Sequence, residues 1–277
     1  MIQFQNVTFG YRGKQVFNDA SFEIGEGSIY GLLGLNGAGK STLLYLTSGL
    51  LFPQSGTVKV NCYDMRERYP EALSEIYIVP EEFSLPPVSF DQYIKCISPF
   101  YPKFSMEMLD RSLDVFGMTR DMHLEQLSMG QKKKAYMCFA LATNTKLLLM
   151  DEPTNGLDIP SKSQFRRAVS ECMSDGRTFI ISTHQVRDVE NLLDRILIMN
   201  DGRLLCDEAT LDISRKLSFV QVGVGEERTD AIYTQPSTIG SVAVVRNETG
   251  DETPLNVELF FNAMLTDSEK VMRVLND

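Results

Sequence analysis

A glycine-rich segment near the start of the chain has the residue types that bind phosphate. Residues 34–42 fit the pattern G-x-x-x-x-G-K-[ST]. Glycines let successive backbone N–H groups close around phosphate oxygens, and the N-terminus of the helix that follows adds positive potential. Lys40 is expected to reach the β and γ phosphates, and Ser41 to place its hydroxyl on Mg²⁺. The pattern predicts a nucleotide-binding loop formed by Asn36, Gly37, Ala38, Gly39, Lys40, Ser41 and Thr42.

Two adjacent carboxylates follow the apolar segment 147–150. Asp151 stands where a carboxylate would hold Mg²⁺ through water, and Glu152 where a base would polarise the water that attacks the γ-phosphate. An acidic pair in this position is by itself usually only the point at which a strand leaves the core. Together with the glycine-rich loop, the pair completes the parts of a nucleotide-hydrolysing site.

A third motif, residues 127–131, reads Leu-Ser-Met-Gly-Gln. It resembles the L-S-G-G-Q signature of the ABC ATPase family, and over about residues 1–210 the chain is identified as a member. The resemblance implies that the motif opens a helix and that Ser128, Gly130 and Gln131 act in trans, on the γ-phosphate bound by the opposite subunit. Taken alone, the pentapeptide would be read as a serine-capped helix start.

Further motifs of the same family follow in order. Residues 156–158 resemble the D-loop, which implies that Asp158 lies at a dimer interface. Residues 182–184 resemble the switch segment, which implies that His184 hydrogen-bonds the γ-phosphate or the attacking water. Tyr11 matches the aromatic residue that stacks on adenine. The predicted catalytic residues are Glu152, His184 and Lys40.

The chain departs from the family at Glu81, where a glutamine is usual after the strand. A carboxylate can bind Mg²⁺ but cannot donate a hydrogen bond as an amide does. Two interpretations stay open: Glu81 joins Ser41 and Asp151 at the metal, or it points into solvent and serves only a permease contact. Farther along, the lysines at 132–134 are predicted to form a solvated helix face.

The elements that position these residues alternate between short apolar strands and amphipathic helices, which is typical of an α/β domain with a mostly parallel sheet. The predicted strands are 28–33, 147–150, 179–181 and 196–199, and the predicted helices are 40–48 and 105–116. The resemblance implies a P-loop NTPase core with an antiparallel β subdomain and a helical subdomain, the latter at about residues 85–142.

Beyond residue 216 the pattern changes to two β-rich stretches, 219–224 and 241–246, and a final helix from Ser268. This predicts an ATPase domain at 1–216 and a small α+β appendage at 217–277. Every motif lies before the appendage, so we expect it to be dispensable for nucleotide chemistry.

Composition limits the partners and the location. A net charge of −10 and a pI near 4.9 weigh against nucleic acid, which needs a basic surface. No apolar run approaches the ~18 residues of a membrane helix, and the first residues do not resemble a signal peptide. We therefore expect a cytoplasmic protein.

The five cysteines lie far apart and are predicted to be free and mostly buried.

The resemblance implies an ATP-binding and hydrolysing subunit of an ABC transporter, with ATP and Mg²⁺ as cofactors. Two copies, or a copy and a paralogue, would close head to tail and drive a separate membrane permease, which would hold the protein on the inner face of the cell membrane. Glu81 and the appendage resemble subunits that serve small efflux-type permeases, which favours export. The alternative is a non-transport ABC ATPase acting on nucleic acid or ribosomes; it is disfavoured because the chain lacks long heptad repeats and has one set of motifs.

Overall fold

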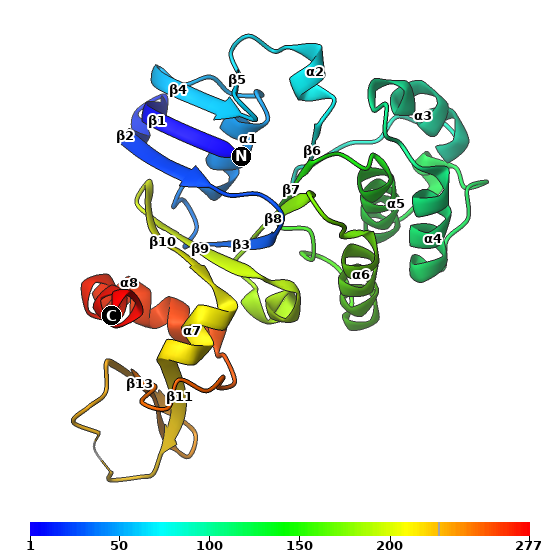
Figure 1. Cartoon of the computed structure of the whole chain (residues 1–277). Helices are drawn as coiled ribbons and strands as arrows, with labels where there is room; N and C mark the ends of the chain where they lie inside the picture. Colours follow the sequence, from blue (N-terminus) through cyan, green and yellow to red (C-terminus); the bar gives the residue numbers. More distant parts are fainter. Residues whose placement is uncertain (227) are drawn as a thin grey trace.

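The computed structural model describes residues 1–226 and 228–277 (Figure 1); Glu227, inside the predicted appendage, lies outside the described residues. A six-stranded sheet with the order β10-β9-β3-β8-β7-β6 forms the centre. Its strands are β3 (Ile29–Leu33), β6 (Ile76–Val79), β7 (Leu147–Asp151), β8 (Thr178–Thr183), β9 (Arg195–Asn200) and β10 (Arg203–Ala209). All neighbours are parallel except β10, which pairs antiparallel with β9.

The central strands are buried on both faces, which explains why they read as continuous apolar runs. In β7, Leu148 and Met150 pack into one hydrophobic cluster while Leu147 and Leu149 pack into another on the opposite face. The predicted α/β fold with a mostly parallel sheet is confirmed, and the four predicted strands each fall on an observed one.

An antiparallel sheet with the order β2-β1-β4-β5 covers one face of the central sheet (Figure 1). Its strands are β1 (Ile2–Tyr11), β2 (Lys14–Ile24), β4 (Ser55–Val60) and β5 (Tyr63–Asp64). The helix α1 (Lys40–Thr47) contributes Leu43, Leu44 and Leu46 to the core that the two sheets share. Because the β1–β2 hairpin turns between Tyr11 and Lys14, it presents both side chains at the same end of the sheet.

The other side of the molecule is formed by α3 (Phe90–Ile97), α4 (Met106–Phe116), α5 (Met129–Ala142) and α6 (Ile159–Cys172), with short turns η1 (Ser98–Phe100) and η2 (Leu124–Gln126) (Figure 1). The short helix α2 (Pro70–Leu73) lies apart from them, on the segment between β5 and β6. The predicted helix 105–116 is confirmed: the Ser105 side chain accepts from the Met108 backbone, and Gly117 ends the helix at a φ of 65°. Met106, the first residue of this helix, is exposed, whereas Leu109, Leu113 and Phe116 are buried.

The last part of the chain contains α7 (Thr210–Lys216), β11 (Leu217–Val222), β12 (Tyr233–Ser237), β13 (Gly240–Arg246) and α8 (Val257–Asn276). The three strands form a separate sheet with the order β11-β13-β12. The helix predicted from Ser268 is only the second half of α8, which begins eleven residues earlier and is interrupted at Asp267. The Asp267 carboxylate accepts from the Lys270 backbone and so caps this second half.

The helix α8 packs onto the ATPase part of the chain rather than standing apart. Phe260 and Met264 are buried in the same hydrophobic cluster as Ile196 and Ile198 of β9. Arg187, in the turn η3 (Val186–Asp188), also forms an ion pair with Glu258 of α8 at 2.7 Å. The division at residue 216 thus stays a prediction.

Within the described residues, none of the helices combines the length and apolar character needed to cross a membrane. The five cysteines are free; Cys138, Cys172 and Cys206 are buried, whereas Cys62 and Cys96 are exposed. This agrees with the expected set of mostly buried thiols.

Candidate active site

The predicted phosphate loop joins β3 directly to α1. Gly37 and Gly39 adopt φ angles of 84° and 107°, which residues with a side chain rarely reach. A Cβ at Gly34 would lie 2.6 Å from the Met199 carbonyl oxygen, so the start of the loop also tolerates only glycine. The sequence therefore folds here into a turn whose backbone N–H groups can face an anion at the N-terminus of α1.

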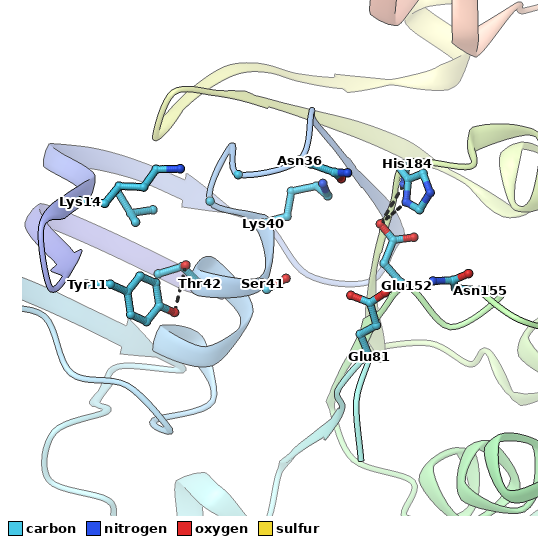
Figure 2. A pocket seen from close by; sticks show the side chains of 13 residues that line it. Tyr11, Lys14, Asn36, Lys40, Ser41, Thr42, Glu81, Glu152, Asn155 and His184 are labelled. Carbon is cyan, nitrogen blue, oxygen red and sulfur yellow. Dashed lines mark hydrogen bonds and ion pairs between the residues drawn. The ribbon is translucent and has the colours of Figure 1, made fainter. Parts of the chain in front are cut away.

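Lys40 is buried beside this loop. Its Nζ donates to the Gly34 carbonyl at 2.8 Å and to the Leu35 carbonyl at 3.3 Å. Burial lowers the pKa of Lys40, while the negative charges of Glu152, Asp151 and Glu81 act in the opposite direction. In Figure 2 the lysine side chain points toward Glu152 across the mouth of the loop.

Glu152 is buried directly after β7 and is held by three contacts from Thr183 and His184, at the end of β8. Oε1 accepts from the His184 backbone N–H at 3.0 Å and lies 2.8 Å from His184 Nδ1. Oε2 accepts from the Thr183 hydroxyl at 3.2 Å. The backbone of Glu152 has a φ of 46°, a left-handed conformation that is strained for a residue with a side chain. Glu152 and His184 are therefore brought together as a fixed pair.

Asp151 lies beneath the site rather than on its surface. It is 1% exposed, and its Oδ1 accepts from the Ser182 hydroxyl at 2.6 Å. Its charge still reaches the site: it opposes the burial that lowers the pKa of Lys40, and it adds to the burial that raises the pKa of Tyr45. The Ser182 bond leaves Oδ2 as a further acceptor.

These residues surround a pocket of about 530 Å³ (Figure 2). It is lined by Tyr11, Lys14, Val16, Asn36, Gly37, Gly39, Lys40, Ser41, Thr42, Glu81, Glu152, Asn155 and His184. Most of the predicted site residues thus meet in one place. The pocket lining does not include Ala38, Asp151, Ser128, Gly130, Gln131 and Asp158.

Tyr11 stands at the edge of the pocket. It is half exposed, and its hydroxyl lies 3.3 Å from the Thr42 hydroxyl. The ring packs edge-on against Phe9, with the centroids 5.2 Å apart. This leaves much of the ring open to solvent, so that a flat base could pack on it.

The signature motif lies outside this pocket, at the start of α5. Ser128 is the N-cap residue: its Oγ accepts from the Gln131 backbone, and Gln131 Oε1 accepts from the Ser128 backbone at 3.0 Å. Asp158 has a similar place at the start of α6, where it accepts from the Ser161 backbone at 2.9 Å. Both motifs therefore form capped helix starts.

The prediction of a solvated lysine face at 132–134 is wrong for Lys133. This side chain is buried, and its Nζ donates to the backbone oxygens of Glu152 at 2.7 Å and of Asn155 at 2.9 Å. Helical periodicity could have predicted this burial, because Lys133 shares the inner face of α5 with the buried Met137 and Ala140.

Glu81 lines the pocket, and its Oε1 accepts from the Asn155 side chain at 3.0 Å. Sequence reasoning missed three pocket residues, Lys14, Val16 and Asn155. The first two follow the β1–β2 turn, and only the pairing of these strands places them beside the phosphate loop.

Comparisons with known proteins agree with the geometry. The ABC transporter family model matches residues 17–155. An uncharacterised ABC transporter ATP-binding protein of Methanocaldococcus jannaschii is 30% identical over 229 residues, which cover 79% of this chain and 82% of that protein. The linearmycin resistance ATP-binding protein LnrL of Bacillus subtilis is 32% identical over 223 residues, 78% of this chain and 72% of that protein.

Among solved structures, an ATP-binding subunit of an ABC transporter matches with a TM-score of 0.69 and 25% identity. The match covers 78% of this chain and 92% of that one. From the matched family model, the relatives and the assembled pocket it follows that this chain belongs to the ABC transporter family as one of its ATP-binding proteins, and that it is an ATPase.

Proposed function

We propose that this chain is the ATP-hydrolysing subunit of an ABC transporter and that Glu152 is the base that activates the attacking water. The observation that carries the proposal is one pocket in which the phosphate loop faces the Glu152–His184 pair. ATP binds with its phosphates on the N-terminus of α1 and beside Lys40, and its adenine packs on Tyr11.

The donor atoms around the loop fit a magnesium ion, because hard cations prefer oxygen ligands. The Ser41 hydroxyl faces the pocket, Asp151 keeps Oδ2 free beneath it, and Glu81 offers a carboxylate on the far side. We infer that Ser41 and Asp151 hold the ion, with Glu81 as a third acidic group. When bound, the ion would neutralise charge on the phosphates.

Glu152 and His184, which follow β7 and β8, activate and orient the attacking water. Glu152 takes a proton from water, and its fixed carboxylate needs no rearrangement before it does so. With the His184 Nδ1–H donated to Glu152, Nε2 is an acceptor; it lies 3.5 Å from the Gln185 side-chain nitrogen and can orient the same water in its place.

Two copies, or a copy and a paralogue, close head to tail over the nucleotides. Ser128, Gly130 and Gln131 act on the nucleotide of the opposite subunit, which is supported by their place outside the pocket of their own chain. The Ser128 Oγ accepts its capping bond, so its O–H is free to donate to a phosphate. The start of α5 adds positive potential, and Asp158 lies at the interface.

A second groove, of about 610 Å³, supports a permease contact near Glu81 and the helical insert. It runs between β6 and the helical side of the molecule, and Leu50 and Phe100 on its rim are 55% and 69% exposed. An apolar helix or loop of a permease would cover such a surface. The permease would hold the protein at the inner face of the cell membrane.

We infer that transport runs outward. The glutamate at position 81 and the appendage resemble subunits of small efflux-type permeases, and one relative is named for linearmycin resistance. Reconstitution with a permease encoded beside this chain would test direction, since export and import move substrate across a vesicle wall in opposite senses.

Glu152→Gln tests the central proposal. The amide keeps the size of the side chain but removes the base, so ATP should still bind while turnover falls by roughly 10²-fold or more. The nucleotide-bound dimer should accumulate. Glu26→Gln, in the exposed turn before β3, is the matched control for loss of one carboxylate. Near-normal hydrolysis by Glu152→Gln would overturn the assignment.

A further inference from the structure

Lys133 forms a buried contact that the proposed mechanism has not used. It lies on α5, two residues after Gln131, and its ammonium group reaches the turn that follows β7. There it donates to the carbonyl of Glu152 and to that of Asn155. Since the Asn155 N–H also donates to the Glu152 carbonyl at 3.2 Å, these two residues are the first and last of a tight turn.

A buried ammonium group is expensive unless polar partners surround it. Burial lowers the pKa of Lys133, whereas the charges of Glu81, Glu152 and Asp151 act in the opposite direction. The two carbonyl oxygens are the polar partners that the ammonium group has at this buried position.

The turn that Lys133 contacts is the strained part of the site. Glu152 has a φ of 46°, and such conformations persist only where the surroundings fix them. Three contacts hold the backbone on either side of its Cα: the N–H of Glu152 donates to the Ser182 carbonyl at 3.0 Å, and its carbonyl accepts from Lys133 at 2.7 Å and from the Asn155 N–H at 3.2 Å. Without the lysine, the carbonyl keeps only the bond within its own turn.

We propose that Lys133 is a positioning residue that clamps the 152–155 turn and thereby aims the Glu152 carboxylate at His184. The inference rests on the proposed role of Glu152 as the base. The clamp also includes Glu81, because the Asn155 side chain at the end of the turn donates to Glu81 Oε1 at 3.0 Å. The helix that carries the signature motif is thus joined to the base of its own subunit.

The test compares Lys133→Met with Lys132→Met, which removes the same charge from the neighbouring position on α5. Lys133→Met should lower kcat by about tenfold or more, because small misplacements of a catalytic group have large effects on rate. The Kd for ATP with Mg²⁺ should change by less than about threefold. Lys132→Met should retain kcat. Lys133→Arg should recover part of it, since a guanidinium keeps the donors.

The Glu152→Gln background separates this inference from the proposed function. If Lys133 acts through Glu152, adding Lys133→Met to Glu152→Gln should cause little further loss of turnover. If Glu152→Gln alone keeps turnover, the proposed base is wrong. If Glu152→Gln loses turnover while Lys133→Met does not, only the positioning role is overturned.

Thermal melting checks that the variants fold. Should Lys133→Met fail to fold, Lys133→Gln takes its place, because a glutamine keeps a polar group but is too short for both carbonyls. Three results overturn the proposal. The first is a parallel loss of kcat and ATP affinity in Lys133→Met, and the second is an effect on kcat equal to that of Lys132→Met. The third is a double variant, Lys133→Met with Glu152→Gln, whose loss of turnover equals the product of the two single losses.

Discussion

His184 and the carboxylate of Glu152 are joined at two points, one on the ring and one on the backbone of the histidine. Nδ1 lies 2.8 Å from Oε1, and the backbone N–H of His184 donates to the same oxygen at 3.0 Å. The two residues follow the adjacent parallel strands β7 and β8, whose pairing brings Asp151 opposite Ser182. The geometry of the pair is therefore a property of the sheet.

His184→Ala removes the ring contact but keeps the backbone bond to Glu152. We expect turnover to fall by about tenfold to a hundredfold, less than in Glu152→Gln, and ATP affinity to change little. Steady-state hydrolysis and nucleotide titration measure the two quantities. A larger loss in His184→Ala than in Glu152→Gln would point to the histidine as the principal base.

Mixing two inactive variants tests whether the site is shared. A Lys40→Ala subunit and a Ser128→Ala subunit together place both lesions in one composite site and leave the other intact. Hydrolysis should partly recover relative to either variant alone. If cross-linking verifies mixed dimers and activity stays flat at every mixing ratio, Ser128 does not act in trans.

Glu81→Gln tests the acidic group beside the metal ligands. The glutamine carbonyl can still accept from Asn155, so the variant removes charge while retaining that contact. Without Mg²⁺, Glu81, Asp151 and Glu152 repel the phosphates, so the variant should show a weaker dependence of ATP affinity on Mg²⁺.

The measurement is ATP affinity with Mg²⁺ and with EDTA, for both forms. Glu82→Gln, at the exposed neighbour outside the pocket, is the charge-matched control. If Mg²⁺ changes the ATP affinity of Glu81→Gln and of the unmodified chain by the same factor, Glu81 does not belong to the metal site. Its remaining role would then be in permease contact.

The packing of α8 predicts a difference between two neighbouring substitutions. Phe260 is fully buried, so Phe260→Ala should lower the free energy of unfolding by about 3–5 kcal/mol. The Arg187–Glu258 ion pair is exposed, so Glu258→Ala should lower it by less than about 1 kcal/mol. Denaturant unfolding measures both. Per folded molecule, hydrolysis should be retained, as expected for an appendage without motifs.

Alkaline unfolding should depend on Tyr93. Burial raises the pKa of this phenol from its usual 10 to about 12. Between these values the unfolded chain has lost a proton that the folded chain keeps, so stability falls as the pH rises from about 10 to about 12. Tyr93→Phe should reduce that fall, and Tyr63→Phe, at a more exposed ring, is the control. An unchanged pH dependence in Tyr93→Phe would contradict the assignment.

Local patterns were sufficient to predict much of the fold. The phosphate loop and the buried strands depend on short runs of residue types, and a strand buried on both faces needs nothing more than a continuous apolar run. The first half of α8 was missed because its segment 257–266 contains valine and two adjacent phenylalanines, which also suit a strand. Packing against β9 and β10 decides in favour of the helix.

The parts of the site that sequence could not supply depend on contacts between distant elements. The burial of Lys133 requires the turn after β7, and the left-handed backbone of Glu152 is fixed by Ser182 and Lys133 from two other segments. No local pattern encodes such a conformation. The pairing of Glu81 with Asn155, 74 positions apart, belongs to the same class.

The burial of α8 also bears on the order in which the chain can fold during synthesis. Residues 257–264 fill a cluster that contains Leu33, more than 200 positions earlier, and Ile198. Contacts of such long sequence separation form late, because the intervening chain must first be closed into a loop. When the phosphate loop has already emerged from the ribosome, the nascent chain therefore still exposes the apolar surface against which α8 will pack. Chaperone binding to stalled chains should accordingly persist until residues 257–264 emerge.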